Sequence, residues 1–141
     1  MIILDTNVVS ALMRASSEPR VVAWLDLQPV ESIWITCITV FEATLGIALL
    51  PKGRRRTALE TSFRQFLEID VESRVLDFDR AAAEASATLS AERQRTGRMV
   101  DVRDTQIAGI ALARRASLAT RNVRHFADAG LALVNPWDTE P

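Results

Sequence analysis

Short apolar runs alternate along the chain with longer stretches in which apolar residues recur every three or four positions. The short runs are rich in β-branched residues and predict strands over 1–5, 32–36, 75–78, 118–120 and 131–134. The longer stretches predict helices over 18–27, 39–50, 54–67, 80–95 and 102–115, with Pro19 in a first turn and Asp79 as an N-cap. This alternation favours an α/β fold in which helices cover both faces of a parallel sheet of four to five strands.

Composition narrows the class of protein. The chain has 141 residues, 48% of them hydrophobic and 25% charged, and we expect a single domain over 1–141. Its apolar runs are too short for a membrane helix, and the early acid Asp5 argues against a signal peptide. One cysteine and one histidine allow no internal disulfide and exclude most zinc sites, so a reducing cytoplasm is the expected location.

Charge is unevenly distributed, although the net charge is only −1. Between positions 90 and 124 there are eight arginines and three acids, and a second basic cluster occupies 52–56. Such clusters can form a basic face for nucleic acid, or they can simply solvate helix surfaces. Charge alone leaves both interpretations open.

Acidic and small polar residues follow the predicted strands. Asp5 ends the first strand, Glu42 lies in the helix after the second, and Asp104 begins the helix before the fourth. In a parallel sheet, the carboxyl ends of the strands meet at one edge, where ligands bind. Glu42 is the only charged residue between Glu31 and Lys52, and an unpaired carboxylate is costly to bury there.

Each of these residues also has a purely structural interpretation. Asp5 could cap the next helix, and Glu42 could pair with an arginine at a helix–helix contact. Asp104 could be an ordinary first-turn acid, with Asp101 as its competitor for a site role. The polar residues after the fourth strand, Thr120 and Asn122, could simply form a turn.

The joint pattern favours a metal site. Three carboxylates at one sheet edge repel one another, and a divalent cation relieves that repulsion. Oxygen ligands suit Mg²⁺ or Mn²⁺, which also bind phosphate oxygens. With arginines nearby, the chemistry indicated is hydrolysis of phosphodiesters, in which the metal activates water and neutralises charge on the phosphate.

Four short motifs, in this order, resemble those of PIN-domain ribonucleases. They are Ile3-Leu4-Asp5-Thr6-Asn7, the stretch 39–46 around Glu42, Asp104-Thr105-Gln106-Ile107-Ala108, and Thr120-Arg121-Asn122. Their spacing, together with Asn135-Pro136-Trp137-Asp138, is most similar to that of the VapC toxins and their FitB-like branch. The resemblance covers almost the whole chain.

That resemblance implies a PIN-like three-layer α/β/α sandwich with strand order 3-2-1-4-5. Asp5, Glu42 and Asp104 would be the catalytic triad that holds Mg²⁺ or Mn²⁺. The protein would be a metal-dependent endoribonuclease that cuts RNA, often tRNA in this family, as the toxin of a type II toxin–antitoxin system. It would form a homodimer in the cytoplasm, without a membrane, and a cognate antitoxin would silence it. That antitoxin can place an arginine in the acidic site, and operator DNA would be bound only through it.

The resemblance also suggests supporting residues. Thr6, Asn7 and Thr120 would orient water or the scissile phosphate. Family members often have an aspartate where this chain has Asn122; an amide keeps a ligand oxygen but loses a charge, so a second metal should bind more weakly. Arg98, Arg103 and Arg121 are candidates for RNA backbone contacts.

We interpret His125 as structural or RNA-facing, and Trp24, Trp34 and Trp137 as core or interface residues. The helices around 21–27 and 45–50 are candidates for an apolar groove that takes the antitoxin or a dimer partner.

Two alternatives belong to other classes of function. A phosphatase of the haloacid dehalogenase type also begins with a strand ending in Asp, but it needs a second aspartate where this chain has Asn7. It also needs a lysine near the phosphate, and the only lysine is Lys52. A response-regulator receiver would need an acidic pair on the first strand. A non-catalytic PIN-fold scaffold stays open because of Asn122.

Overall fold

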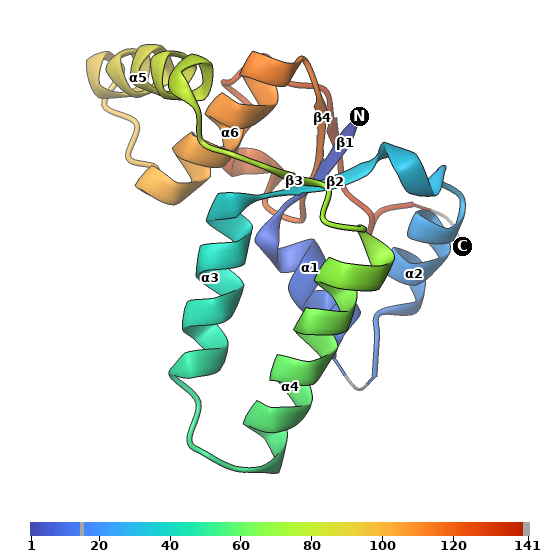
Figure 1. The fold of residues 1–141 in the computed structure, drawn as a ribbon. Helices are drawn as coiled ribbons and strands as arrows, with labels where there is room; N and C mark the ends of the chain where they lie inside the picture. The colour runs from blue at the N-terminus through green and yellow to red at the C-terminus, as the bar shows by residue number, and fades with distance from the viewer. Residues whose placement is uncertain (15, 140–141) are drawn as a thin grey trace.

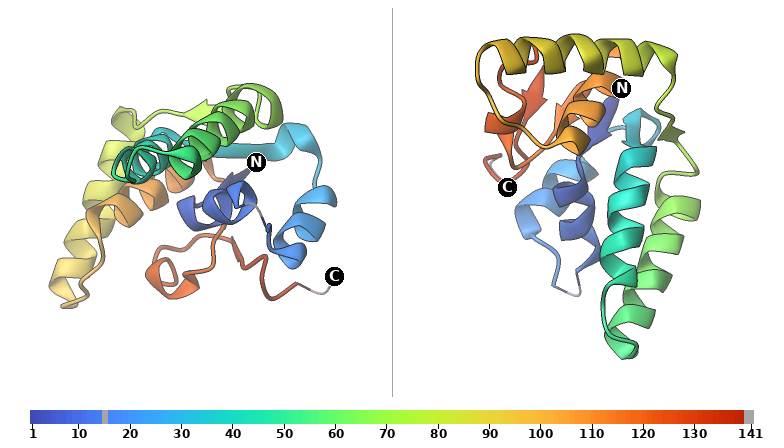
Figure 2. Two further views of the ribbon diagram at one scale, coloured as in Figure 1. Left: turned by 90° about the horizontal axis from the view of Figure 1, so that it is seen from below. Right: turned by 90° about the vertical axis from the view of Figure 1, so that its left-hand side faces the viewer.

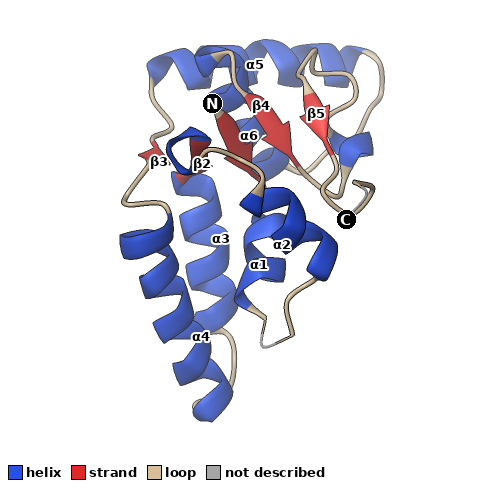
Figure 3. Cartoon of the chain, turned by 90° about the vertical axis from the view of Figure 1, so that its right-hand side faces the viewer, coloured by secondary structure: helices blue, strands red, loops and turns tan. Residues whose placement is uncertain are grey.

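A computed structural model describes residues 1–14 and 16–139 of the chain. At its centre lies a sheet of five strands, all parallel, in the order β3-β2-β1-β4-β5 (Figure 3). Their bounds are β1 (Ile2–Leu4), β2 (Ile33–Thr36), β3 (Val75–Leu76), β4 (Ser117–Ala119) and β5 (Leu133–Val134). The strand order that the family resemblance implied is confirmed.

Helices cover both faces of this sheet (Figure 1). One face packs against α1 (Thr6–Met13), α2 (Pro19–Asp26), α3 (Cys37–Ala48) and α4 (Arg54–Gln65), and the other against α5 (Arg80–Arg95) and α6 (Val102–Arg114). Figure 2 shows α3 and α4 as a hairpin that projects well beyond the sheet. Three short turns of helix complete the fold: η1 (Val30–Ser32), the π-helical η2 (Phe66–Asp70) and η3 (Val123–His125). The three-layer α/β sandwich is therefore confirmed.

The short strands carry the core because both of their faces are buried. Ile3 and Leu118 face the cluster beneath α5 and α6, whereas their neighbours Leu4 and Ala119 face the cluster beneath α1 to α4. All four side chains are fully buried. Burial on both faces explains why the strands consist mostly of consecutive apolar residues instead of alternating apolar and polar ones.

The N-terminal segment departs from the predicted elements. The strand expected over 1–5 ends at Leu4, and α1, for which the apolar pattern predicted no bounds, follows at Thr6. Asp5 separates the two because its carboxylate accepts a hydrogen bond from the backbone N–H of Thr6 and caps the helix. The predicted positions of Pro19 at a helix start and of Asp79 as an N-cap are both confirmed.

Close packing of α5 on α6 depends on Gly109. A Cβ at this position would lie 1.8 Å from the Ser86 hydroxyl and 2.7 Å from the Ala82 carbonyl oxygen. This contact fixes α6, and with it the first turn that carries Asp104. None of the helices in the described part of the chain is long and apolar enough to cross a membrane.

Candidate active site

Asp5 lies at the end of the central strand β1 and is only 3% exposed. Its Oδ1 accepts from the Thr6 backbone at 2.8 Å, and its Oδ2 accepts from the Thr120 hydroxyl at 2.7 Å and the Asn7 amide at 3.2 Å. Burial raises the pKa of Asp5 from 3.8 to about 6, opposed by the hydrogen bonds from Thr120 and Thr6. The charges of Asp104 and Glu42 raise this pKa further. Asp5 is thus both a helix cap and a buried carboxylate next to two others.

Glu42 projects from α3 toward Asp5. Its Oε1 accepts from the Thr6 hydroxyl at 2.9 Å, and its Oε2 lies 3.8 Å from the Arg103 guanidinium. The structural interpretation of an arginine pair across a helix contact is therefore correct for this residue. The pair is long and the Arg103 side chain is 40% exposed, so it neutralises Glu42 only partly.

Asp101 and Asp104, the two candidates at the start of α6, differ in position. Asp101 is the N-cap: its Oδ1 accepts from the Arg103 backbone N–H at 2.8 Å, and this bond is the main cause of its lowered pKa. Asp104 stands in the first turn, and its Oδ2 lies 2.8 Å from His125 Nδ1. Of the two, Asp104 is the one that lines the acidic pocket.

The three carboxylates share one pocket of about 340 Å³ at the carboxyl edge of the sheet. Its wall is formed by residues from α1, α3, α6 and the segments that follow β1, α1, β4 and β5, namely Asp5, Thr6, Asn7, Ser10, Arg14, Glu42, Asp104, Arg121, Asn122 and Trp137. Thr120 lies fully buried beneath it and connects Asp5 with the backbone N–H of Asn122, which donates to the Thr120 hydroxyl at 3.0 Å. The residues predicted to support the triad are brought together here.

Three lining residues were missed from sequence. Ser10 and Arg14 follow Thr6 at helical spacing, so a correct prediction of α1 would have placed Ser10 on the same face. Trp137 was assigned to core or interface; it packs partly on the core but also lines the pocket. Its position after Asn135-Pro136 carries no local indication of that second surface.

The predicted RNA-binding arginines separate in the structure. Arg121 lines the pocket. Arg103 contacts Glu42, which lines the pocket, and also lies 3.4 Å from Asp101. Arg98 is elsewhere: it pairs with Asp128 and donates to the carbonyl of Arg124. Arg98 is therefore not one of the residues brought together at the site.

His125 lies closer to the acids than expected, because its ring contacts Asp104 directly. Behind it lies an ion pair in which the buried Arg93, 3% exposed, makes a two-pronged contact with the partly exposed Asp128 at 2.9 and 3.0 Å. Arg93 also donates to the His125 carbonyl and to the Thr105 hydroxyl, each at 2.7 Å. The ion pair thus fixes the position of the His125 backbone.

The donor chemistry of the pocket fits a hard divalent cation. All its acidic donors are carboxylate oxygens, and their mutual repulsion contributes to the raised pKa of Asp5. As they stand, no three acid, histidine or cysteine side chains of residues 1–14 and 16–139 converge as a finished metal cage. Glu42 is held by Thr6 and Asp104 by His125, so both side chains must turn to bind a common ion.

Comparison with known proteins gives a consistent result. The model of the PIN domain family matches residues 2–131. The chain is 38% identical over 138 residues to the VapC ribonuclease Y4jK of Sinorhizobium fredii, covering 98% of this chain and 99% of that protein. It is 36% identical over 137 residues to the toxin FitB of Neisseria gonorrhoeae, covering 97% and 99%. A solved structure of FitAB bound to an IR36 DNA fragment superposes with a TM-score of 0.89 at 35% identity, covering 100% and 99% of the two chains.

Proposed function

Because the chain belongs to the PIN-domain family, and within it to the VapC and FitB toxins, we propose that it is a metal-dependent endoribonuclease and the toxin of a type II toxin–antitoxin system. One observation carries this proposal: Asp5, Glu42 and Asp104, from three distant segments, line one pocket with Asn122. Purely structural acids have no reason to gather at one sheet edge, where they repel one another. The family match to PIN proteins also argues against the haloacid dehalogenase alternative.

The roles of the side chains follow from their contacts. Asp5, Glu42 and Asp104 would hold Mg²⁺ or Mn²⁺, which when bound supplies water activation and neutralises charge on the phosphate. Thr120 and Asn7 fix the orientation of Asp5 through its Oδ2.

Around the triad, Arg14 and Arg121 supply positive charge that offsets the three carboxylates in the same pocket. Asn122 offers a neutral oxygen at its rim. Arg14 and Asn122 would position the scissile phosphate against the triad.

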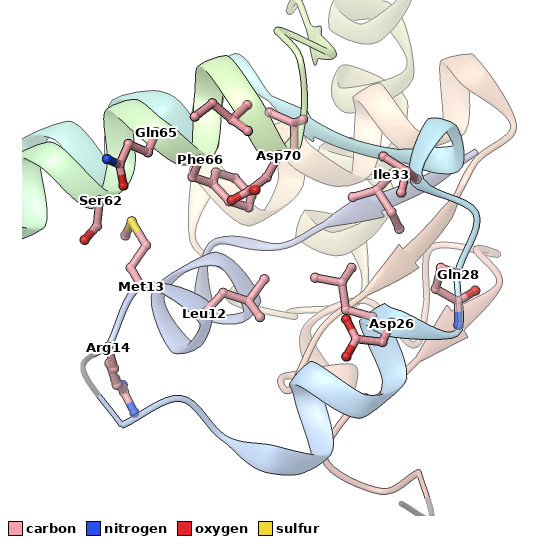
Figure 4. A pocket seen from close by; sticks show the side chains of 14 residues that line it. Leu12, Met13, Arg14, Asp26, Gln28, Ile33, Ser62, Gln65, Phe66 and Asp70 are labelled. Carbon is pink, nitrogen blue, oxygen red and sulfur yellow. The ribbon is translucent and has the colours of Figure 1, made fainter.

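We place the cognate antitoxin in apolar grooves next to this pocket. A cavity of about 690 Å³ lies between α1, α2 and α4, and Figure 4 shows Leu12, Met13 and Phe66 along it. A second, of about 660 Å³, runs from Glu42 past Gly46 and Ile47 toward Arg55. The family resemblance supports a homodimer in the cytoplasm that contacts operator DNA through its antitoxin.

Cleavage of labelled total tRNA by the purified, antitoxin-free protein tests the proposal. We expect cleavage with Mg²⁺ or Mn²⁺, none with chelator, and a loss of about 10³-fold or more in Asp5→Asn, which also controls for contaminating nuclease. Absence of both cleavage and metal binding in the folded protein would favour a non-catalytic scaffold instead, whereas metal binding without cleavage would indicate a narrow RNA substrate. Cleavage that persists in chelator would overturn the assigned mechanism.

A further inference from the structure

Arg121 and Trp137 lie next to each other in the wall of the acidic pocket. The Arg121 guanidinium lies over the Trp137 ring, 5.0 Å from the ring centroid, which is within the range of a cation–π contact. Both side chains line the pocket that contains Asp5 and Asp104. Arg121 is exposed and makes no ion pair with a described residue, although three carboxylates line the same pocket. Its guanidinium contacts the Trp137 ring instead of pairing with an acid.

The backbone beneath both side chains is anchored. The N–H of Trp137 donates to Asn135 Oδ1 at 3.0 Å, and its carbonyl accepts from Arg20 of α2 at 3.0 Å. The N–H of Arg121 donates to Asn7 Oδ1 at 3.2 Å, and the Asn7 amide donates to Asp5. One side-chain amide, that of Asn7, therefore connects the backbone of Arg121 to the buried carboxylate at the centre of the site.

From this geometry we propose that Arg121, backed by Trp137, is a stacking platform for the base of a nucleotide next to the scissile phosphate. Planar guanidinium groups stack on the faces of RNA bases, and an aromatic ring behind the guanidinium keeps it in the required plane. A base can reach the platform only when it is unstacked from its neighbours, so the cut lies in a single-stranded segment. This inference rests on the proposed ribonuclease function.

The competing role for Arg121 is a simple charge contact with an RNA phosphate. Lysine distinguishes the two, because it keeps the charge and loses the plane. The measurement is binding affinity, with Ca²⁺ in place of Mg²⁺ so that RNA stays uncut. The two probes are a short single-stranded RNA oligonucleotide and a ribose–phosphate oligomer of equal length that lacks bases.

Arg121→Lys should weaken binding of the RNA about tenfold, which is typical of one lost base stack. It should leave binding of the abasic oligomer unchanged. Arg95→Lys, a matched change at an exposed arginine on α5, should alter neither. Equal weakening of both probes, or no change for the RNA, would overturn the stacking platform.

Trp137→Phe and Trp137→Leu extend the test to the ring behind the guanidinium. Trp137→Phe keeps an aromatic face and should retain most of the affinity, whereas Trp137→Leu should lose about as much as Arg121→Lys. In the Trp137→Leu background, Arg121→Lys should cost little more, because the two residues act as one unit. Additive losses would overturn that coupling, and the Arg121→Lys comparison decides the proposal even if Trp137→Leu fails to fold.

The two proposals fail in different ways. If the folded wild-type protein neither binds nor cuts RNA, the ribonuclease function and the platform both fall. If it binds and cuts RNA with metal while Arg121→Lys binds both probes as the wild type does, only the platform falls.

Discussion

Two aspartates near the same edge of the molecule have opposite electrostatics. Asp128 pairs with Arg93, and the hydrogen bonds and charge of that guanidinium lower the pKa of Asp128. Asp5 is more deeply buried, accepts only from neutral donors, and its pKa is raised to about 6. The Asp128–Arg93 pair is balanced in charge and keeps Asp128 ionised, whereas the unbalanced charge of the buried Asp5 favours a bound cation.

The two regions are also physically connected. Arg93 donates to the carbonyl of His125, and the ring of His125 lies against Asp104. The balanced pair is therefore a rigid support behind one carboxylate of the unbalanced pocket. Substitutions on each side should separate stability from activity.

The largest difference should appear in the pH dependence of metal-free stability. Between about pH 4 and pH 6 the folded protein holds a proton on Asp5 that the unfolded chain has released. The raised pKa of Asp5 thus adds about 3 kcal/mol to the free energy of unfolding. This stabilisation is fully present below about pH 4 and is lost as pH rises through about 6. Urea unfolding in chelator, repeated across this range, measures it.

Asp5→Asn is the control for that measurement, because an amide does not titrate. The difference in unfolding free energy between wild type and Asp5→Asn should fall from about pH 4 to about pH 6 and then level off. A difference in unfolding free energy that does not change with pH would contradict the raised pKa of Asp5. The lowered pKa of Asp128 acts in the opposite sense: its contribution is present at neutral pH and is lost in acid.

Breaking the balanced pair should have the next largest effect. Asp128→Asn leaves Arg93 buried without its carboxylate and should lower the free energy of unfolding by about 2 kcal/mol, less than a fully buried pair would lose because Asp128 is 29% exposed. Chemical denaturation at pH 7 checks this value. Glu84→Gln, which breaks an exposed pair with Arg80, is the matched control and should change stability by less than about 0.5 kcal/mol. Equal effects would show that burial is not what matters.

Adding a negative charge to the pocket should strengthen its binding of a divalent cation. Asn122→Asp would place a fourth carboxylate at the rim and should tighten Mn²⁺ binding about tenfold, because each added acid strengthens a hard-cation site. Isothermal calorimetry on the wild type, Asn122→Asp and the charge-neutral control Asn122→Ala measures the change. Equal or weaker affinity in Asn122→Asp would contradict this role.

The smallest effect is expected at the contact between the two regions. His125→Gln keeps a side-chain N–H that can reach Asp104, so RNA cleavage should stay within about tenfold, or 1.4 kcal/mol of barrier. Single-turnover cleavage rates check this, with His125→Ala as the variant that removes the contact. A far larger loss in His125→Gln would assign the ring a direct part in the chemistry.

Much of the fold could be predicted because its signals are local. The two-sided apolar strands, the cap at Asp79 and the proline at the start of α2 all depend on residues within a few positions of one another. The helix over 6–13 was missed because its start shares Asp5 with the strand, and its polar face, Thr6, Asn7 and Ser10, lines the pocket instead of a solvated surface.

By itself the sequence determined which residues carry the charge and the oxygen donors, and that parallel strands would bring Asp5, Glu42 and Asp104 to one edge. Only the tertiary structure decided their partners. It used Asp101 as a helix cap and left Asp104 to line the pocket. It placed Arg103 next to Glu42, His125 next to Asp104 and Arg121 over the Trp137 ring. These contacts join residues from different elements, and helix packing and side-chain rotamers set them to within an ångström, which no local pattern of residue types encodes.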